Sequence, residues 1–192
     1  MSYEKSEKWE YGPESKQEKG TTATVEITGT DGTIDIKTTA LGTANSSSAS
    51  GARDATLNGE ITWKATGVNP MPKTRTRIRV EAEWDYSIEL SSAEETKAHG
   101  EANGSMTLTV DGNQVDDSTL FQRKKSVPLP STSNTTDKQT QEIFSETVVH
   151  SSPLKYAVKV SVSANASHEG HSSAEAKARI AKIKITANPK EV

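Results

Sequence analysis

Residues Thr74–Leu90 read TRTRIRVEAEWDYSIEL, and along this stretch apolar and charged side chains alternate. Every second residue from Ile78 to Leu90 is apolar, and the residues between them are charged apart from Ser87. A period of two predicts a β-strand with one buried face and one face in water. At about 3.3 Å per residue this stretch would span about 56 Å, roughly three times the length of a typical strand.

The composition restricts how such strands can pack. The chain has 192 residues, of which 31% are hydrophobic, and about a quarter are Ser or Thr. Because the few apolar residues fall on one face of each segment, the core must be thin, two sheets deep at most. The sequence therefore predicts an all-β fold: an antiparallel β-sandwich, jelly-roll-like, of about 8–10 strands with long hairpins.

Turn signals divide the rest of the chain into shorter strands. Asp-Gly pairs predict tight turns at Thr30–Thr33 and Asp111–Gly112. The polar segments 45–54 and 128–141 are interpreted as loops, the first as a possible hairpin tip. Leu154–Ala187 is interpreted as a long hairpin with its tip at His168–His171, and a phase slip near Ile180 predicts a β-bulge.

The first 20 residues form a separate unit in this interpretation. They are charged and contain Gly12–Pro13, which is typical of a tail, yet they carry three of the nine aromatic residues, Tyr3, Trp9 and Tyr11. Either this arm folds back as an edge strand of its own domain, or it adds a strand to a neighbouring subunit. The domain plan is an N-terminal arm, residues 1–20, and a single β-sandwich domain, residues 21–192.

The charged face of the long strand is divided by sign. Its first half is basic and its second half acidic, in the order Arg75, Arg77, Arg79, Glu81, Glu83 and Asp85. Such a row can form cross-strand salt bridges and protect an edge. It can also pair head-to-tail with its own copy, because one patch carries both signs. These six residues and the three arm aromatics are the candidate self-association residues.

No pattern of catalytic or cofactor-binding residues stands out. His168 and His171 lack the spacing of a helical zinc motif, and the oxygen-rich loop Asp111–Asp117 lacks EF-hand spacing. The chain has no Cys, no Gly-x-Ser-x-Gly elbow and no phosphate loop. We therefore expect a protein that is not an enzyme and has no cofactor, metal or catalytic residues.

Net charge and hydropathy limit the kinds of partner that we expect. A net charge of -3 makes nucleic acid a poor partner, and no run is long enough for a membrane helix. No apolar signal-peptide core follows Met1, so the localisation is open, with an extracellular or cell-surface placement favoured. We expect a homo-oligomer formed through the arm or the charged strand face.

Three functions fit these features. The first is a structural, self-assembling subunit of a filament, appendage, surface layer or virion, joined by strand addition of the arm. The second is a carbohydrate- or ligand-binding β-sandwich, although Trp63 and Trp84 lie on apolar strand faces and are expected in the core. The third is a β-pore-forming protein in which Ile78–Leu90 would face lipid.

Overall fold

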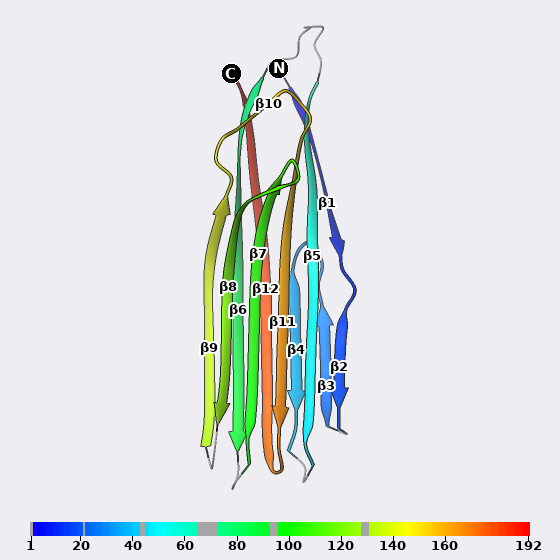
Figure 1. Cartoon of the computed structure of the whole chain (residues 1–192), viewed down its shortest axis with the longest axis vertical. Helices are drawn as coiled ribbons and strands as arrows, with labels where there is room; N and C mark the ends of the chain where they lie inside the picture. The colour runs from blue at the N-terminus through cyan, green and yellow to red at the C-terminus, as the bar shows by residue number, and fades with distance from the viewer. Residues whose placement is uncertain (1, 21, 43–44, 65–72, 93–95, 128–130) are drawn as a thin grey trace.

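The computed structural model describes residues 2–20, 22–42, 45–64, 73–92, 96–127 and 131–192, and the regular elements in these ranges are all β-strands. They run along the long axis of a narrow molecule (Figure 1). In chain order the strands are β1 (Tyr3–Tyr11), β2 (Ser15–Lys19), β3 (Ala23–Thr28), β4 (Ile34–Ala40), β5 (Ser47–Trp63), β6 (Thr74–Ser92), β7 (Ala98–Val110), β8 (Asn113–Val127), β9 (Ser131–Phe144), β10 (Val148–His150), β11 (Leu154–His168) and β12 (Ser172–Glu191).

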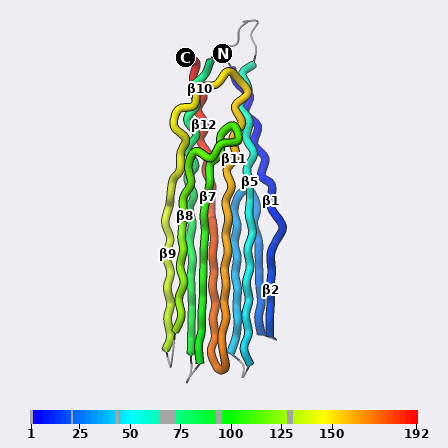
Figure 2. Tube along the Cα trace, viewed as in Figure 1, coloured from blue at the N-terminus to red at the C-terminus, as the bar shows by residue number. Residues whose placement is uncertain are grey.

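Two antiparallel sheets pack face to face, which confirms the predicted all-β sandwich. Sheet I has the order β1-β5-β11-β7-β8, with β2 also paired to β5, and sheet II has the order β10-β6-β12-β4-β3, with β9 also paired to β6. Figure 2 shows β1 and β2 following one another along β5. β9 and β10 share β6 in the same way, so the twelve described strands fill ten positions in the two sheets. The sequence predicts about 8–10 strands, fewer than the structure has, because β1 and β2, like β9 and β10, are segments that follow one another along a single long strand.

The stretch that predicts the fold is one continuous strand. β6 is 19 residues long, and its inward side chains from Thr74 to Leu90 are all at most 4% exposed. Trp84 and Tyr86 of this row meet Phe121 of β8, with ring centroids 5.1 and 5.7 Å apart. Because β8 lies at the edge of sheet I, this aromatic cluster joins the two sheets along one side of the sandwich.

The predicted turns and the bulge are confirmed. Asp31 and Gly32 have φ values of 48° and 84°, and Asp111 and Gly112 have values of 47° and 81°. These are the left-handed conformations that a two-residue hairpin turn requires. The pairing of β12 with β6 shifts register between Ile180 and Lys182, which lets the apolar row stay on the inner face.

Three sequence interpretations are wrong. The segment Leu154–Ala187 is not a hairpin, because β11 pairs with β5 and β7 in sheet I while β12 pairs with β4 and β6 in sheet II. The two strands face one another across the core instead. Most of segment 45–54 belongs to β5, and residues 131–141 belong to β9, so neither is a loop. Residues 128–130 of the second segment lie outside the described residues.

Small inward residues let the sheets approach closely near one end of the sandwich. On β7 these are Ala98, Gly100 and Ala102, each enclosed in the core. A Cβ atom added to Gly100 would lie 2.5 Å from Cγ2 of Ile88 on the opposite sheet, closer than carbon atoms pack. A larger residue at this position must therefore displace the stiff β-branched side chain facing it.

His150 fixes the short strand β10 to the beginning of β6. Its ring is only 9% exposed, and its Nε2 atom lies 2.6 Å from Oγ1 of Thr74 and 3.0 Å from Oγ1 of Thr76. Burial lowers the pKa of His150 below its ordinary value of 6.5, and the carboxylate of Asp111 opposes this only in part. The folded chain therefore favours the neutral imidazole.

The close approach at Gly100 predicts a stability effect. The substitution Gly100→Ala lowers the free energy of unfolding by about 1–3 kcal/mol, because the new methyl group overpacks the core against Ile88. Urea unfolding followed by tryptophan fluorescence measures this change. Gly12→Ala is the matched control, because its added Cβ would meet its nearest neighbour, Asp54, at an ordinary 3.6 Å. Equal losses in the two variants would contradict close packing at Gly100.

The lowered pKa of His150 predicts acid sensitivity. A folded-state pKa below the unfolded value of 6.5 means that the unfolded chain binds the proton more readily, so stability falls as pH drops below about 6.5. In His150→Gln the unfolding free energy changes less between pH 7 and pH 5 than in the parent chain. Val149→Ala, at the exposed neighbouring position, keeps the parent slope. Parallel slopes for the parent and His150→Gln would overturn the assignment.

Candidate functional site

The N-terminal arm lies along the edge of sheet I in the single chain. β1 pairs with β5 over nine residues, from Tyr3 opposite Trp63 to Tyr11 opposite Ala55. Trp9 and Tyr11 are the two half-buried residues of β1, and the other seven residues are exposed. Main-chain hydrogen bonds and a few aromatic contacts therefore hold this strand, and most of its side chains contribute little burial.

The half-buried aromatics dock on the turn between β3 and β4. The Trp9 ring covers Gly32 so closely that an added Cβ there would lie 2.3 Å from its Cζ2 atom. The Tyr11 hydroxyl accepts a hydrogen bond from the Gly32 amide at 2.9 Å and donates one to the Thr33 carbonyl at 3.1 Å. The Arg53 guanidinium lies 4.5 Å above the Tyr11 ring, and burial raises the pKa of this tyrosine. The turn thus acts as a receptor for the arm.

A second set of contacts anchors the beginning of the arm. The Tyr3 ring packs edge-on against Trp63, with centroids 5.9 Å apart. Lys5 and Glu7 form an ion pair at 2.7 Å, and Glu7 also accepts a hydrogen bond from the buried hydroxyl of Tyr156 on β11. Burial and the neighbouring carboxylate raise the pKa of Tyr156, so this phenol stays protonated and serves as a donor.

On the charged face of β6, the acidic half is neutralised within sheet II. Glu81, Glu83 and Asp85 lie opposite basic residues of β12, in cross-strand register. The distances are 3.3 Å to Lys184, 3.6 Å to Lys182 and 3.9 Å to Arg179, in the same order. This half of the row is therefore engaged in cross-strand salt bridges of the kind that stabilise a sheet only modestly at a solvated surface.

The basic half is only partly engaged. Arg79 donates through Nε to Glu142 of β9 at 2.9 Å, and this bond lowers the pKa of the carboxyl. The Arg77 guanidinium stacks 4.5 Å above the Phe144 ring, which is 45% exposed. Within the described ranges no carboxylate lies within 4.0 Å of Arg75 or Arg77. The structure thus brings the six charged candidates together on one face, and among the described residues Arg75 and Arg77 form no ion pair.

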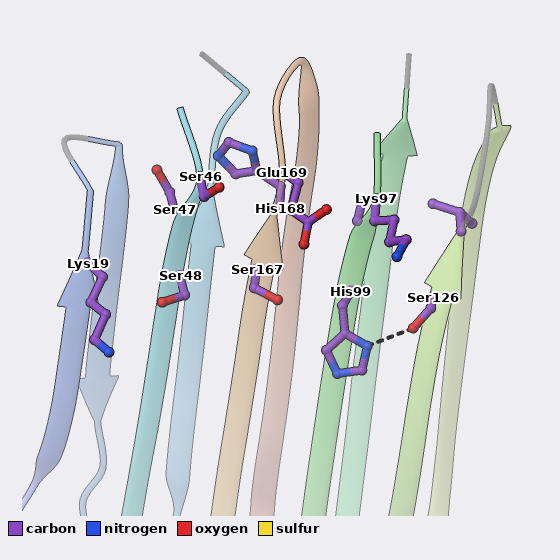
Figure 3. A pocket seen from close by; sticks show the side chains of 12 residues that line it. Lys19, Ser46, Ser47, Ser48, Lys97, His99, Ser126, Ser167, His168 and Glu169 are labelled. Carbon is purple, nitrogen blue, oxygen red and sulfur yellow. Dashed lines mark hydrogen bonds between the residues drawn. The ribbon is translucent and has the colours of Figure 1, made fainter. Parts of the chain in front are cut away.

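A depression of about 680 Å³ crosses the ends of the strands of sheet I (Figure 3). It is basic and rich in hydroxyl groups, lined by Lys19, Ser46, Ser47, Ser48, Lys97, Ala98, His99, Ser126, Val127, Ser167, His168 and Glu169. His99 Nδ1 and Ser126 Oγ are 2.8 Å apart, while Glu101 stands 4.0 Å from the other ring nitrogen, beyond hydrogen-bond distance. The burial of His99 and the charge of Lys124 lower its pKa.

The structure separates the candidate metal ligands. His168 turns inward and is 3% exposed, whereas His171 is exposed at the turn between β11 and β12. In the second loop, Asp111 accepts a hydrogen bond from the Lys155 amide, and Asp116 accepts one from the Phe144 amide. Within the described ranges no group of three or more His, Asp or Glu side chains could hold a metal ion. The same ranges contain no helix long and apolar enough to cross a membrane.

Comparison with known proteins adds little to this geometry. No protein family and no curated protein matches the chain. Among solved structures it is similar to TmCBM61 in complex with β-1,4-galactotriose, with a TM-score of 0.20 and 10% identity, covering 92% of this chain and 89% of that chain. A chain of the T13 IBDV viral particle gives a TM-score of 0.11 and 8% identity, with coverages of 69% and 49%. Both likenesses are too weak to bear on function.

Two parts of the site were missed by sequence reasoning. The sequence identifies the receptor for the arm, the turn that contains Gly32, only as a turn. Lys182 and Lys184, the basic partners of Glu83 and Glu81, can be recognised in the sequence, because they alternate with apolar residues as regularly as the two glutamates do. Matching two outward rows of opposite sign would have paired β12 with β6.

The docking of Tyr11 predicts how firmly the arm is held. Tyr11→Phe removes both hydrogen bonds to the turn and leaves the Gly32 amide without its partner. Local opening of β1 then becomes easier by about 1–3 kcal/mol, seen as faster amide hydrogen exchange in residues 3–11. Tyr3→Phe is the control, because the exposed Tyr3 makes a ring contact that this substitution keeps. Equal effects of the two substitutions would contradict the docking.

Proposed function

We propose that this protein is a non-enzymatic, self-assembling β-sandwich subunit whose N-terminal arm exchanges between copies. The observation that supports this most is the way in which β1 is attached. Nine residues pair with β5 through the main chain, while seven of the nine residues are exposed. Because main-chain bonds and a turn receptor are identical in every copy, the same strand fits the β5 edge of a neighbour equally well.

The chain also has a suitable hinge. Gly12, Pro13 and Glu14 separate β1 from β2. The Gly12 amide donates a hydrogen bond to the Asp54 carbonyl at 2.9 Å. Pro13 carries no amide hydrogen, so the ladder is interrupted here in any case. Rotation about these three residues would release β1 and leave β2 in place. Exchange preserves every β1–β5 bond, so its free energy depends mainly on concentration and hinge strain.

The other two functions have less support in the geometry. The row that a pore-forming hairpin would turn towards lipid, Ile78–Leu90, fills the core between the sheets. Trp63 and Trp84 are only 7% and 4% exposed, as the sequence predicts for core residues, so neither ring is free to stack on a sugar. The residues that line the depression in Figure 3 include no Phe, Tyr or Trp.

Cysteine mixing tests arm exchange directly, because the chain has no cysteine of its own. Lys8 and Asn58 are exposed and lie opposite each other in the β1–β5 register. Lys8→Cys and Asn58→Cys are prepared separately, mixed, refolded together and treated with a short bismaleimide. Arm exchange gives a covalent heterodimer on a denaturing gel, since each cysteine then meets its counterpart on another chain.

Two controls make this experiment decisive. The double variant Lys8→Cys/Asn58→Cys shows that the pair can be bridged, and Lys8→Cys mixed with Thr107→Cys, which lies three strands away on β7 of sheet I, gives no product. Light scattering of the chain lacking residues 1–12 adds a mass measurement. Bridging within the double variant, without any heterodimer in the mixture, means that the arm stays on its own chain and refutes the proposal.

A further inference from the structure

The beginning of β6 and the end of β12 carry a cluster of cations on the outer face of sheet II. Arg75 and Arg77 alternate with buried threonines on β6, and both arginines are exposed. Lys190 of β12 is also exposed and lies directly opposite Arg75. Figure 1 shows this end of β12, marked C, beside the beginning of β6 and the short strand β10. These three residues are called the cationic patch.

The described part of the chain does not balance the charge of the cationic patch. Cross-strand neighbours have Cβ atoms about 4.5–5.5 Å apart, so like charges placed opposite each other destabilise a sheet. The β6–β12 ladder of described residues contains one other such pair, Glu89 opposite Glu175. That pair is relieved by Lys37 and Lys177, which lie 3.2 and 3.0 Å from the Glu175 carboxylate. By contrast, no described carboxylate comes within 4.0 Å of the three residues of the cationic patch.

Two exposed apolar side chains lie beside the cationic patch. Val149 of β10 is 52% exposed and lies directly opposite Arg75, on the side away from Lys190. The Phe144 ring is 45% exposed, and the Arg77 guanidinium lies 4.5 Å above it. Stacking on this ring restricts the guanidinium, so less side-chain entropy is lost when it binds an anion. Arginine and aromatic residues are both enriched at protein interfaces.

We propose that the cationic patch binds an acidic segment of another protein, held in an extended conformation with carboxylates at alternate residues. Arg75 and Arg77 are two residues apart on one strand, a separation of about 6.8 Å. Side chains on one side of an extended peptide repeat at the same distance, so two carboxylates meet the two guanidinium groups in register. Lys190 adds a third cation beside the first, and an apolar residue of the peptide contacts Phe144 or Val149.

The acidic residues of this chain do not supply that segment. Glu81, Glu83 and Asp85 of β6 have the required spacing, but each already lies opposite a basic residue of β12 within 4.0 Å. A second copy would have to break these ion pairs to reach the patch. Glu146, between β9 and β10, is exposed and forms no ion pair with the described residues. The patch uses no residue of the N-terminal arm, so it does not depend on the proposed arm exchange.

Two fluorescent peptides of identical composition test the spacing. Both contain three glutamates among threonine and valine, at alternate positions in one peptide and three residues apart in the other. In fluorescence anisotropy at low salt the alternating peptide binds at least about 5-fold more tightly, because its carboxylates fall on one side of the extended chain. Equal affinities, or no binding of either peptide, overturn the inference. Binding to phosphatidylserine vesicles without binding to the peptides also overturns it, and identifies a membrane surface as the partner.

Matched charge variants locate the site on the chain. Arg75→Gln/Arg77→Gln weakens binding of the alternating peptide by about 10-fold or more, because both charge-assisted contacts are lost. Lys124→Gln/Lys125→Gln removes the same charge from exposed positions of β8 and leaves the affinity unchanged. Phe144→Ala keeps every charge and weakens binding by about 2- to 5-fold, because Arg77 loses the ring on which it stacks. Equal losses in the two double variants mean attraction by net charge alone and refute the site.

Discussion

The packing of the sandwich depends on one row of buried side chains that runs the whole length of β6. Its inward side chains from Thr74 to Leu90 are sealed between the sheets, and Trp84 and Tyr86 reach the Phe121 ring of sheet I. Because a strand exposes its two faces at a strict period of two, this row forces its outward neighbours into water. The length of the molecule and the position of the charged face both follow from that row.

Much of this architecture could be predicted from residue pattern, and the exceptions have a physical cause. The Asp-Gly turns and the phase slip at Ile180 are local signals, and each appears where the sequence places it. The partners of β11 and β12 could not be predicted in this way. Consecutive strands with alternating apolar rows satisfy the same pattern whether they pair within a sheet or face one another across a core.

The strand β9 and the arm illustrate the limits of the same reasoning at the sheet edges. Both faces of β9 consist mostly of polar residues, because the strand lies at an edge of sheet II where it contacts little of the core. Its sequence therefore resembles that of a loop. The arm is the reverse case: Trp9 and Tyr11 indicate burial correctly, but the surface that buries them is a turn whose glycine offers no side chain to recognise. A sequence pattern shows which residues will be buried more readily than it shows the surfaces that bury them.

The edge of sheet I therefore connects this fold to its proposed assembly. Sheet I ends in β1, a strand held mainly through its main chain. A small, thin core is sufficient for such a subunit, because arm exchange would join two copies while preserving every main-chain hydrogen bond between β1 and β5.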